Sequence, residues 1–386
     1  MNISALPLPD THAIAHSAQL LALIRDELAA AGGWISFARY MELALYAPGL
    51  GYYSAGATKF GEAGDFVTAP EMTPLFGHTL ARQVMEVLAQ TGGSVLELGA
   101  GRGRLAAAIL EEMQRVGKLP DQYLILEVSA DLQAVQKQHL QAVLAPALYE
   151  RVCWLDALPE SFTGVMLANE VLDAVPVHVV SKYGTGWQEM GVTADDQAGL
   201  MLMPRALLNQ ALVADIDTLN LPEPYQTEVS PAARALVASL AECLQQGVLL
   251  FIDYGFSRAE YYHPQRQQGT LMCHYRHHAH PDPLFHPGLQ DITAHVDFSA
   301  MAEAGQAQGL QLLGYCGQAQ FLINCGITDL MLRVPVHDLK QYAPLASQAQ
   351  KLLSPAEMGE LFKVLALGRG VVPLSGFVRG DRSHTL

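Results

Sequence analysis

The chain has 386 residues, of which 50% are hydrophobic and 16% charged, and its formal net charge is −15. Such a composition excludes wholesale disorder and provides a core for one large α/β domain with insertions, or for two domains. The acidic balance argues against nucleic acid as the main partner and favours encounters with basic substrates.

Cysteine spacing and hydropathy indicate the compartment. The five cysteines form no CxxC pair, so we predict neither a zinc site nor a disulfide framework. No apolar run reaches the roughly 18 residues of a membrane span, and the N-terminus resembles neither a secretory signal nor a transit peptide. We expect a cytoplasmic protein, or one of the mitochondrial matrix if the source is eukaryotic. The oligomeric state stays open, a homodimer included.

The N-terminal part is predicted to be helical. Residues 13–31 have helical periodicity that ends at a Gly-Gly pair, and 34–45 form a second helix. Residues 46–76 are rich in glycine, proline and aromatic side chains and show no period. A loop of this length is typically functional, with a plain linker as the alternative. We therefore divide the chain into an N-terminal part with a covering loop, residues 1–77, and a core, residues 78–386.

A glycine-rich loop follows the first predicted strand, in the stretch SVLELGAGRGR at 94–104, and a helix is predicted at 105–113. Its glycines, which permit a tight turn and close approach to a ligand, are Gly99, Gly101 and Gly103. A dinucleotide fingerprint has its third glycine three residues after the second, where this chain has Arg104. Glu97 suits a cationic ligand end better than a pyrophosphate. The amino group and sulfonium of S-adenosylmethionine are cationic.

Strands and helices then alternate. Apolar strands are predicted at 123–128, 152–155, 164–168 and 247–254, with a helix at 132–144. This pattern predicts a mostly parallel sheet covered on both faces, with ligands at the carboxyl ends of its strands. Carboxylates stand at or just past the predicted strand ends: Glu97, Glu127, Asp156, Glu170 and Asp253.

An antiparallel β meander interrupts this pattern. Residues 175–203 alternate apolar and polar side chains between turn signals. With helices at 206–216 and 231–246, the insertion at about 175–246 is expected to form a substrate-side subdomain. A loop at 255–290, a helix at 298–308, a strand at 310–315 and a final strand at 373–378 complete the prediction.

A histidine-rich segment at 274–280 lies in the predicted loop. Metal ligands on one local segment would normally pair with an acidic or cysteine partner at helical or hairpin spacing, and this stretch has prolines on either side. We therefore interpret it as a flexible loop, a lid or a substrate wall rather than as a metal site. Asp297 is expected to cap the helix that follows. His295 is equally consistent with a binding role and with a structural one.

Seven stretches together resemble the MidA family of class I S-adenosylmethionine-dependent methyltransferases. They are MELALYAPGLGYYS (41–54), KFGEAGDFVTAPEMTPLFG (59–77), VLELGAGRGRLA (95–106), LANEVLDAVPV (167–177), LLFIDYG (249–255), DITAHVDF (291–298) and MGELFKVL (358–365). GDFVTAPEM and NEVLDAVPV in this order are the specific part. The resemblance implies a Rossmann-like, seven-stranded, mostly parallel sheet with an antiparallel last strand. Mitochondrial members of the family are complex I assembly factors and protein arginine methyltransferases.

The resemblance also implies which residues bind the cofactor, S-adenosyl-L-methionine. Glu97 and the three glycines match the loop that holds its methionine part. Glu127 matches the acid that accepts hydrogen bonds from the ribose hydroxyls, with a surface carboxylate as the alternative, and Asp156 matches the position facing adenine. The covering loop matches at Gly64, Asp65 and Phe66.

The acceptor is expected directly after the fourth strand. An arginine acceptor needs carboxylates that pair with its planar fork. We predict Glu170 first and Asp173 second, beside Asn169, on one face if the segment is helical. Helix N-terminal charge is the alternative interpretation. Further substrate-side candidates are Glu71 and His295.

The leading hypothesis is a protein arginine methyltransferase that acts by in-line displacement on a partner protein with an accessible arginine. A small-molecule methyltransferase and an assembly factor that binds cofactor but chiefly holds a partner are the alternatives. A dehydrogenase is the least favoured hypothesis.

Overall fold

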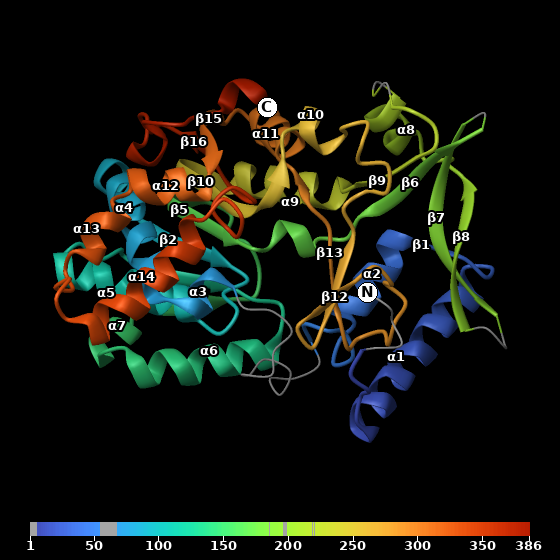
Figure 1. Ribbon diagram of the computed structural model, residues 1–386, viewed down its shortest axis with the longest axis horizontal. Helices are drawn as coiled ribbons and strands as arrows, with labels where there is room; N and C mark the ends of the chain where they lie inside the picture. The colour runs from blue at the N-terminus through green and yellow to red at the C-terminus, as the bar shows by residue number, and fades with distance from the viewer. Residues whose placement is uncertain (1–5, 55–67, 185, 196–198, 218, 220) are drawn as a thin grey trace. The chain divides into compact units, whose positions relative to one another are not determined.

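The computed structural model describes residues 6–54, 68–184, 186–195, 199–217, 219 and 221–386. The chain divides into two compact units, coloured by residue number in Figure 1. The N-terminal unit comprises Met1–Phe66, Asp173–Arg234 and Arg258–His295, and the sheet unit comprises Val67–Leu172, Ala235–Ser257 and Val296–Leu386. The division at residue 77 and the subdomain at about 175–246 stay predictions.

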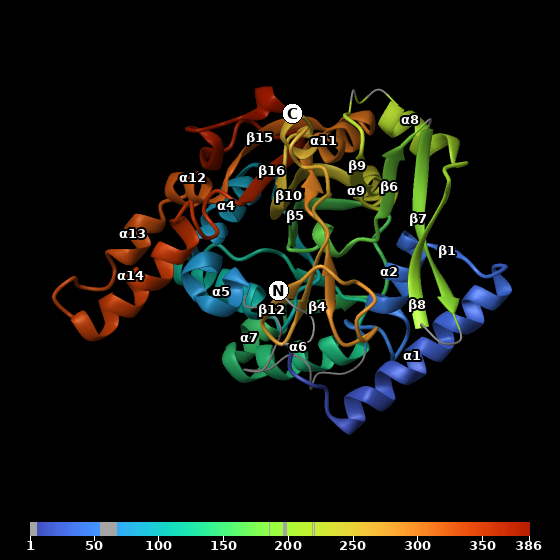
Figure 2. The ribbon, with the colours of Figure 1, turned by 45° about the vertical axis from the view of Figure 1, so that its right-hand side comes forward.

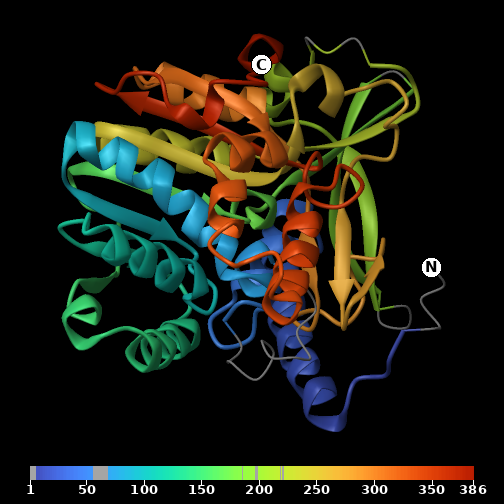
Figure 3. The ribbon, with the colours of Figure 1, turned by 60° about the vertical axis from the view of Figure 1, so that its left-hand side comes forward.

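The sheet unit is built on a path of seven strands in the order β15-β16-β10-β5-β2-β3-β4, with β14 pairing β10 as an eighth. The strands are β2 (Ser94–Leu98), β3 (Tyr123–Leu126), β4 (Val152–Leu155), β5 (Phe162–Asn169), β10 (Leu244–Phe256), β14 (Val296–Asp297), β15 (Gln311–Gly317) and β16 (Phe362–Arg369). β10, β5, β2, β3 and β4 pair in parallel, whereas β16 is antiparallel to β10 and β15. Figure 3 shows these strands side by side. The predicted parallel sheet with an antiparallel last strand is confirmed.

Helices surround this sheet. They are α3 (Ala69–Met72), α4 (Pro74–Thr91), α5 (Arg104–Val116), α6 (Ala130–Val143), α7 (Pro146–Tyr149), α11 (Phe298–Ala307), α12 (Gln318–Asn324), α13 (Ile327–Met331) and α14 (Leu339–Leu353), with 3₁₀ turns at Ser375–Phe377 and Ser383–Thr385. Seven of the eight residues of β16 are buried, as are nine consecutive residues of β10, from Gly247 to Gly255. Strands covered on both faces read as continuous apolar runs for this reason.

Helix α4 was not predicted. It begins where the Thr73 side chain accepts a hydrogen bond from Leu75 N at 3.2 Å, with Pro74 at its first position. It packs against α5, β5 and β10. The unpatterned segment predicted at 46–76 therefore already contains α3 and the start of α4.

The final strand predicted at 373–378 is wrong, because the last strand is β16. The backbone N–H groups of the later segment bond to side chains of α4 instead of a neighbouring strand: Ser375 N donates to Glu86 Oε1 (3.0 Å) and Gly376 N to Gln83 Oε1 (2.8 Å). Its donors are thereby satisfied outside the sheet.

The N-terminal unit contains two antiparallel sheets. One has the order β1-β7-β6-β9 with β8 on β7, and the other is β12-β11-β13. Their strands are β1 (Ile35–Ser36), β6 (His178–Tyr183), β7 (Gly186–Asp195), β8 (Gly199–Ala206), β9 (Tyr225–Val229), β11 (Met272–Tyr275), β12 (His278–His280) and β13 (Asp291–Thr293). Figure 2 shows β6, β7 and β8 side by side. The predicted meander is confirmed, and β1 and β9 extend it.

Helices α1 (Thr11–Ala30) and α2 (Phe37–Tyr46) lie against this meander. Asp10 caps α1 by accepting from two backbone N–H groups, so the helix begins two residues before its predicted start. Ile35 and Ser36 pair with β7, so the second helix begins at Phe37. The remaining helices are α8 (Gln210–Asp217), α9 (Pro231–Cys243), which runs across the unit boundary, and α10 (Arg258–Tyr261).

The histidine-rich segment forms a β hairpin rather than the predicted flexible loop. β11 and β12 are joined at Arg276 and His277, whose φ angles are 47° and 65°. Two consecutive positive φ angles match the twist of a two-residue hairpin turn.

No helix in the described part of the chain is both long enough and apolar enough to cross a membrane.

The contact between β1 and β7 depends on a glycine. A Cβ on Gly191 would lie 2.2 Å from Trp34 Cε2 and 2.3 Å from Ile35 O. A Cβ on Gly186 of the same strand would meet no atom of the described residues within 4 Å. We expect Gly191→Ala to destabilise the protein by about 1–3 kcal/mol through overpacking. Urea unfolding midpoints should show this loss for Gly191→Ala and little change for Gly186→Ala. Equal midpoints for the two variants would contradict the packing argument.

Candidate active site

The parallel strands end at one edge of the sheet, and polar groups follow several of them. β2 runs into the glycine-rich loop, β3 is followed by Glu127, and β4 is followed by Asp156. β5 ends at Asn169, with Glu170 next. Because parallel strands share their direction, these groups stand at the carboxyl edge, where α/β sheets bind ligands.

The glycine loop adopts the conformation that its residue types favour. Gly99, Gly101 and Gly103 have φ angles of 60°, 52° and 82°, in the left-handed region, which glycine adopts without steric cost. Among the residues that the structure describes, no atom would lie within 4 Å of a Cβ on Gly101, so these residues leave room for a ligand beside this backbone. α5 starts directly after the loop.

Glu97 is a buried acid at the end of β2. It is 2% exposed, and Tyr123 Oη donates to its Oε2 at 2.7 Å. Burial raises the pKa of Glu97 to about 7; the Tyr123 hydrogen bond opposes this shift and the charge of Glu127 adds to it. A carboxylate whose pKa is raised by burial is a candidate functional group, and a positive charge beside it would favour its ionised form.

Glu127 is tied to the glycine loop through Gln136. Ser129 N donates to Glu127 Oε1 and Gln136 Nε2 donates to Glu127 Oε2, both at 3.0 Å. Gln136 Nε2 also donates to Gly101 O at 2.9 Å, and Gln136 Oε1 accepts from Trp154 Nε1 at 2.9 Å. Burial raises the pKa of Glu127, and these hydrogen bonds oppose the shift. One amide thus holds three strand ends in a common arrangement.

Sequence reasoning missed Gln136, although a signal was present. Gln136 is completely buried and lies between Leu132 and Leu140 on the buried face of α6. A polar residue on an apolar helix stripe needs hydrogen-bond partners. That position could have been flagged before the partners were known.

The turn after β5 is held in an unusual conformation. Glu170 has a φ angle of 53°, and its N–H donates to Ile252 O at 2.9 Å. Asp253 Oδ2 accepts from Val171 N (3.2 Å) and Leu172 N (2.9 Å). The 3₁₀ turn covers only Leu172–Ala174, so Glu170 is not helical and the condition for a shared helix face with Asp173 is not met.

Asn169 lies beside this turn. Its Nδ2 donates to Glu170 Oε1 at 3.2 Å. Its Oδ1 is buried and, within the described part of the chain, has no hydrogen-bond partner. A buried acceptor of this kind fits a ligand donor.

The remaining cofactor-side residues and the substrate-side candidate Glu71 have different surroundings. Asp156 is exposed directly after β4. Glu71 Oε2 pairs with Arg104 Nε at 2.6 Å, which joins α3 to the first residue of α5. The predicted covering-loop residues lie outside the described residues; they are Gly64, Asp65 and Phe66. The functional roles of all these groups stay predictions.

The N-terminal unit contains the other predicted substrate-side residues. Asp173 is 5% exposed, and its carbonyl accepts from Ala294 N at 3.0 Å. His295 N donates to Thr270 Oγ1 at 3.0 Å.

The expected helix cap at Asp297 is confirmed. Asp297 accepts from Ser299 N and Ala300 N at the start of α11, in the sheet unit.

Sequence reasoning also missed a buried acid in the N-terminal unit. Asp291 is 8% exposed and accepts from Tyr53 Oη at 2.9 Å. The Tyr53 ring stacks on Tyr46 with centroids 5.6 Å apart. All three lie in stretches that carry the family resemblance, and this membership could have marked them as candidate site residues.

Comparison with known proteins decides the family. A model described as an S-adenosyl-L-methionine-dependent methyltransferase family matches residues 79–316. The chain belongs to this family. The protein arginine methyltransferase NDUFAF7, mitochondrial, of Mus musculus is 32% identical over 372 residues, covering 87% of this chain and 81% of the relative. The Homo sapiens protein of that name is 31% identical over 372 residues, covering 87% and 80%.

Solved structures agree with this family. A Burkholderia thailandensis structure bound to S-adenosyl-homocysteine is 52% identical, with a TM-score of 0.96, and the match covers 99% of this chain and all of that one. The resemblance to the MidA family is thereby confirmed. The chain is a methyltransferase, and its cofactor is S-adenosyl-L-methionine.

The residues at the carboxyl edge fit this cofactor. Glu97 is a buried acid suited to a cationic amino group, and Glu127 is an acid suited to a pair of hydroxyls. The open space at Gly101 admits a ligand close to the backbone. When bound, the cofactor supplies a methyl group on a sulfonium.

Cofactor binding should release a proton below pH 7. Between pH 5 and 7 most of Glu97 is protonated in the free protein, because its pKa is raised to about 7. A cationic amino group stabilises the ionised form. The affinity for S-adenosyl-homocysteine should therefore rise up to tenfold per pH unit, level off above pH 7, and show buffer-dependent heats in calorimetry. Glu97→Gln should bind weakly with no such slope. A slope that survives in Glu97→Gln would assign the proton to another group.

The same shift predicts the stability of the protein without cofactor. A carboxyl whose pKa is raised by folding contributes most below its unfolded value, so this contribution should be lost as pH rises towards 7 and be restored by saturating ligand. Urea titrations at pH 5 and pH 8, with and without ligand, measure the difference.

Gln136→Leu should weaken cofactor binding about tenfold, because Glu127 and Gly101 lose their shared donor. Gln133→Leu is the matched control, since Gln133 Nε2 donates to the backbone carbonyl of Glu127 and not to its carboxylate. Calorimetric titration with S-adenosyl-homocysteine checks both. Equal affinities for the two variants would remove Gln136 from the cofactor site.

Proposed function

We propose that this enzyme transfers a methyl group to an arginine side chain of a partner protein. The observation that carries the proposal is the turn after β5, where Glu170 is held at a φ angle of 53° by backbone bonds to Ile252 and, through the two residues that follow it, to Asp253. Strained backbone of this kind concentrates at functional sites.

Glu170 would serve the chemistry in three ways. Its two oxygens can accept from two N–H groups of a planar guanidinium, which leaves one nitrogen oriented for attack. It can also take up the proton that this nitrogen loses as the N–C bond forms and the S–C bond breaks. Holding the acceptor in line is the main contribution that such a site makes.

Two further observations support an arginine in a protein. The formal net charge of −15 favours encounter with basic segments. Relatives that cover most of this chain are named protein arginine methyltransferases. The roles of Asp173, Asn169, Glu71 and His295 in holding the acceptor stay predictions.

Glu170→Gln should leave binding of S-adenosyl-homocysteine nearly unchanged and lower methyl transfer by about two orders of magnitude or more, because the amide cannot take up the proton. Glu170→Gly relieves the positive φ, so it should fold at least as stably as the natural protein and still be inactive. Glu160→Gln, at an exposed position, is the control. Activity close to natural in Glu170→Gln would overturn the role of Glu170.

The acceptor class is tested with labelled S-adenosylmethionine and an extract of the source cells. A labelled protein band that yields methylarginine on hydrolysis is expected. Label only in low-mass material would indicate a small-molecule methyltransferase. No label, with cofactor binding intact, would indicate an assembly factor that chiefly holds a partner.

A further inference from the structure

A second site lies at the opposite edge of the sheet from the glycine loop. A pocket of about 640 Å³ is lined by residues of the later turns of α4 and by the end of α5. α4 ends directly before β2 begins, whereas α5 starts at the glycine loop and runs away from it. Twelve residues of helix separate Arg104 from Val116, which is about 18 Å. The pocket is therefore remote from the carboxyl edge.

The pocket is basic in an acidic protein. Four cations line it against two carboxylates, an excess of two positive charges, in a chain with 38 acidic and 23 basic residues. The cations are Arg82, Arg115, Lys118 and Arg333, and the carboxylates are Glu86 and Glu112. Local charge of sign opposite to the whole chain attracts partners that the rest of the surface repels.

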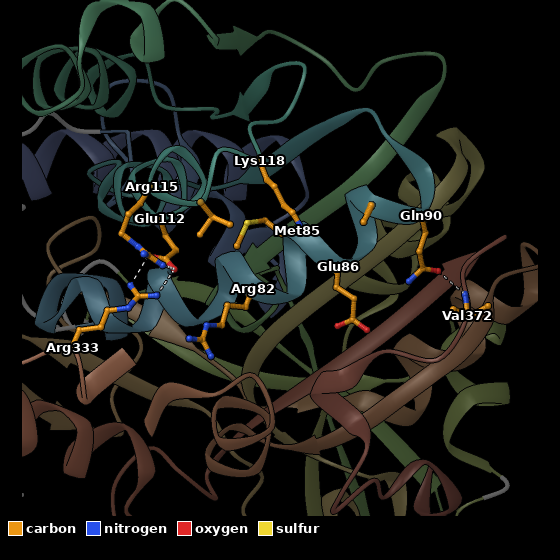
Figure 4. Close-up of a pocket in the computed structure, with 11 residues that line it drawn as sticks. Arg82, Met85, Glu86, Gln90, Glu112, Arg115, Lys118, Arg333 and Val372 are labelled. Carbon is orange, nitrogen blue, oxygen red and sulfur yellow. Dashed lines mark hydrogen bonds and ion pairs between the residues drawn. The ribbon is translucent and has the colours of Figure 1, made fainter. Parts of the chain in front are cut away.

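Both carboxylates are already committed within the fold. Glu112 is 2% exposed, and its oxygens accept from both forks of Arg115 (2.9 and 2.9 Å) and Arg333 (2.7 and 2.8 Å). Glu86 accepts from the backbone and side chain of Ser375. Figure 4 shows Glu112, Arg115 and Arg333, which together we call the arginine clamp, at one end of the pocket. Glu112 offsets one of the two arginine charges, so the group of Glu112, Arg115 and Arg333 keeps one net positive charge.

Lys118 is the cation best placed to receive a partner. It is exposed just beyond α5, and no carboxylate among the residues that the structure describes pairs with it. Arg82 bonds through one nitrogen, Nη1, to two backbone carbonyls and to Asp329 at 3.1 Å, so it contributes less net charge.

Apolar side chains accompany these cations. Val116 is 42% exposed and Val372 is 63% exposed, and Met85 lies on the α4 side. Val372 is fixed by its N–H, which donates to Gln90 Oε1 at 3.0 Å, as the other end of Figure 4 shows. From Arg82 to Gln90, α4 extends about 12 Å, the span of about four extended residues.

We propose that this groove binds an acidic segment of a partner protein, in which carboxylates flank an apolar side chain. The carboxylates pair with Lys118 and the rim of the arginine clamp, and the apolar side chain packs on Met85 and Val116. Charge complementarity selects such a segment over a second copy of this chain, whose formal net charge is also −15. The inference does not depend on which group is methylated, because the groove lies on the edge remote from the glycine loop.

Fluorescence anisotropy with a labelled Asp-Leu-Asp-Leu-Asp peptide and the full chain at low salt tests the proposal. The natural protein should bind it, and Lys118→Glu should weaken binding at least tenfold. Arg25→Glu makes the same charge change at an exposed position of α1 and should bind within twofold of natural. Val372→Ser should weaken binding less than Lys118→Glu does. Hydrogen exchange should slow at residues 82–90 and 112–118 when the peptide binds.

Three results would overturn the proposal. The first is an unchanged affinity in Lys118→Glu, and the second is equal binding of a Lys-Leu-Lys-Leu-Lys peptide. The third is self-association in sedimentation velocity that Lys118→Glu abolishes, because a second copy would then occupy the groove. Since each readout is binding or association, a negative result leaves the proposed arginine methylation untouched, and loss of methyl transfer leaves this groove untouched.

Discussion

Parallel pairing of β4, β3, β2, β5 and β10 is the constraint on which the rest of the sheet unit depends. Every crossover between parallel strands returns the chain to the opposite edge. Residues that follow strands therefore meet at the carboxyl edge, and the ends of crossover helices meet at the amino edge. The first edge receives Glu97, the glycine loop and Glu127, and the second receives the end of α5. Two surfaces of different chemistry follow from one pairing rule.

Two buried carboxylates of the sheet unit have very different pKa values because their hydrogen-bond partners differ. Glu112 and Glu97 are each 2% exposed, so both are largely removed from water. Burial alone would raise the pKa of Glu112, but four N–H donors from Arg115 and Arg333 outweigh it and lower the pKa to about 2. Glu97 has Tyr123 as its donor, and its pKa is about 7. The charge of the first acid is compensated within the fold by two arginines, whereas a cation beside the second would favour its ionised form.

Local patterns made much of the sheet unit predictable. Positive φ at Gly101 follows from residue type, and the strand at 247–254 follows from a continuous apolar run. Helix α4 was missed because it follows an unpatterned segment and is buried on several sides, which blurs its period. The segment 373–378 is apolar enough for a strand, yet its N–H groups bond to Glu86 and Gln83, nearly 300 residues earlier. Gln136 could have been flagged as a polar residue on a buried helix face, but its partners could not be named, because Gly101 and Trp154 lie 35 and 18 residues away in other elements. Long-range hydrogen bonds leave no local pattern.

The turn at Glu170 is held rigidly by its neighbours, which bears on the acceptor-binding role that we propose for this residue. A non-glycine residue in the left-handed region costs on the order of 1–3 kcal/mol and persists only where surrounding contacts determine it. Here the contacts come from β10, because Ile252 O and the Asp253 carboxylate together receive three successive backbone N–H groups, from Glu170 to Leu172. Asp253 is 1% exposed, so its hydrogen bonds compete little with water. The conformation of the turn is set by β10, so under the proposed function an acceptor would meet a carboxylate on a rigid base and would not have to order a loop around itself.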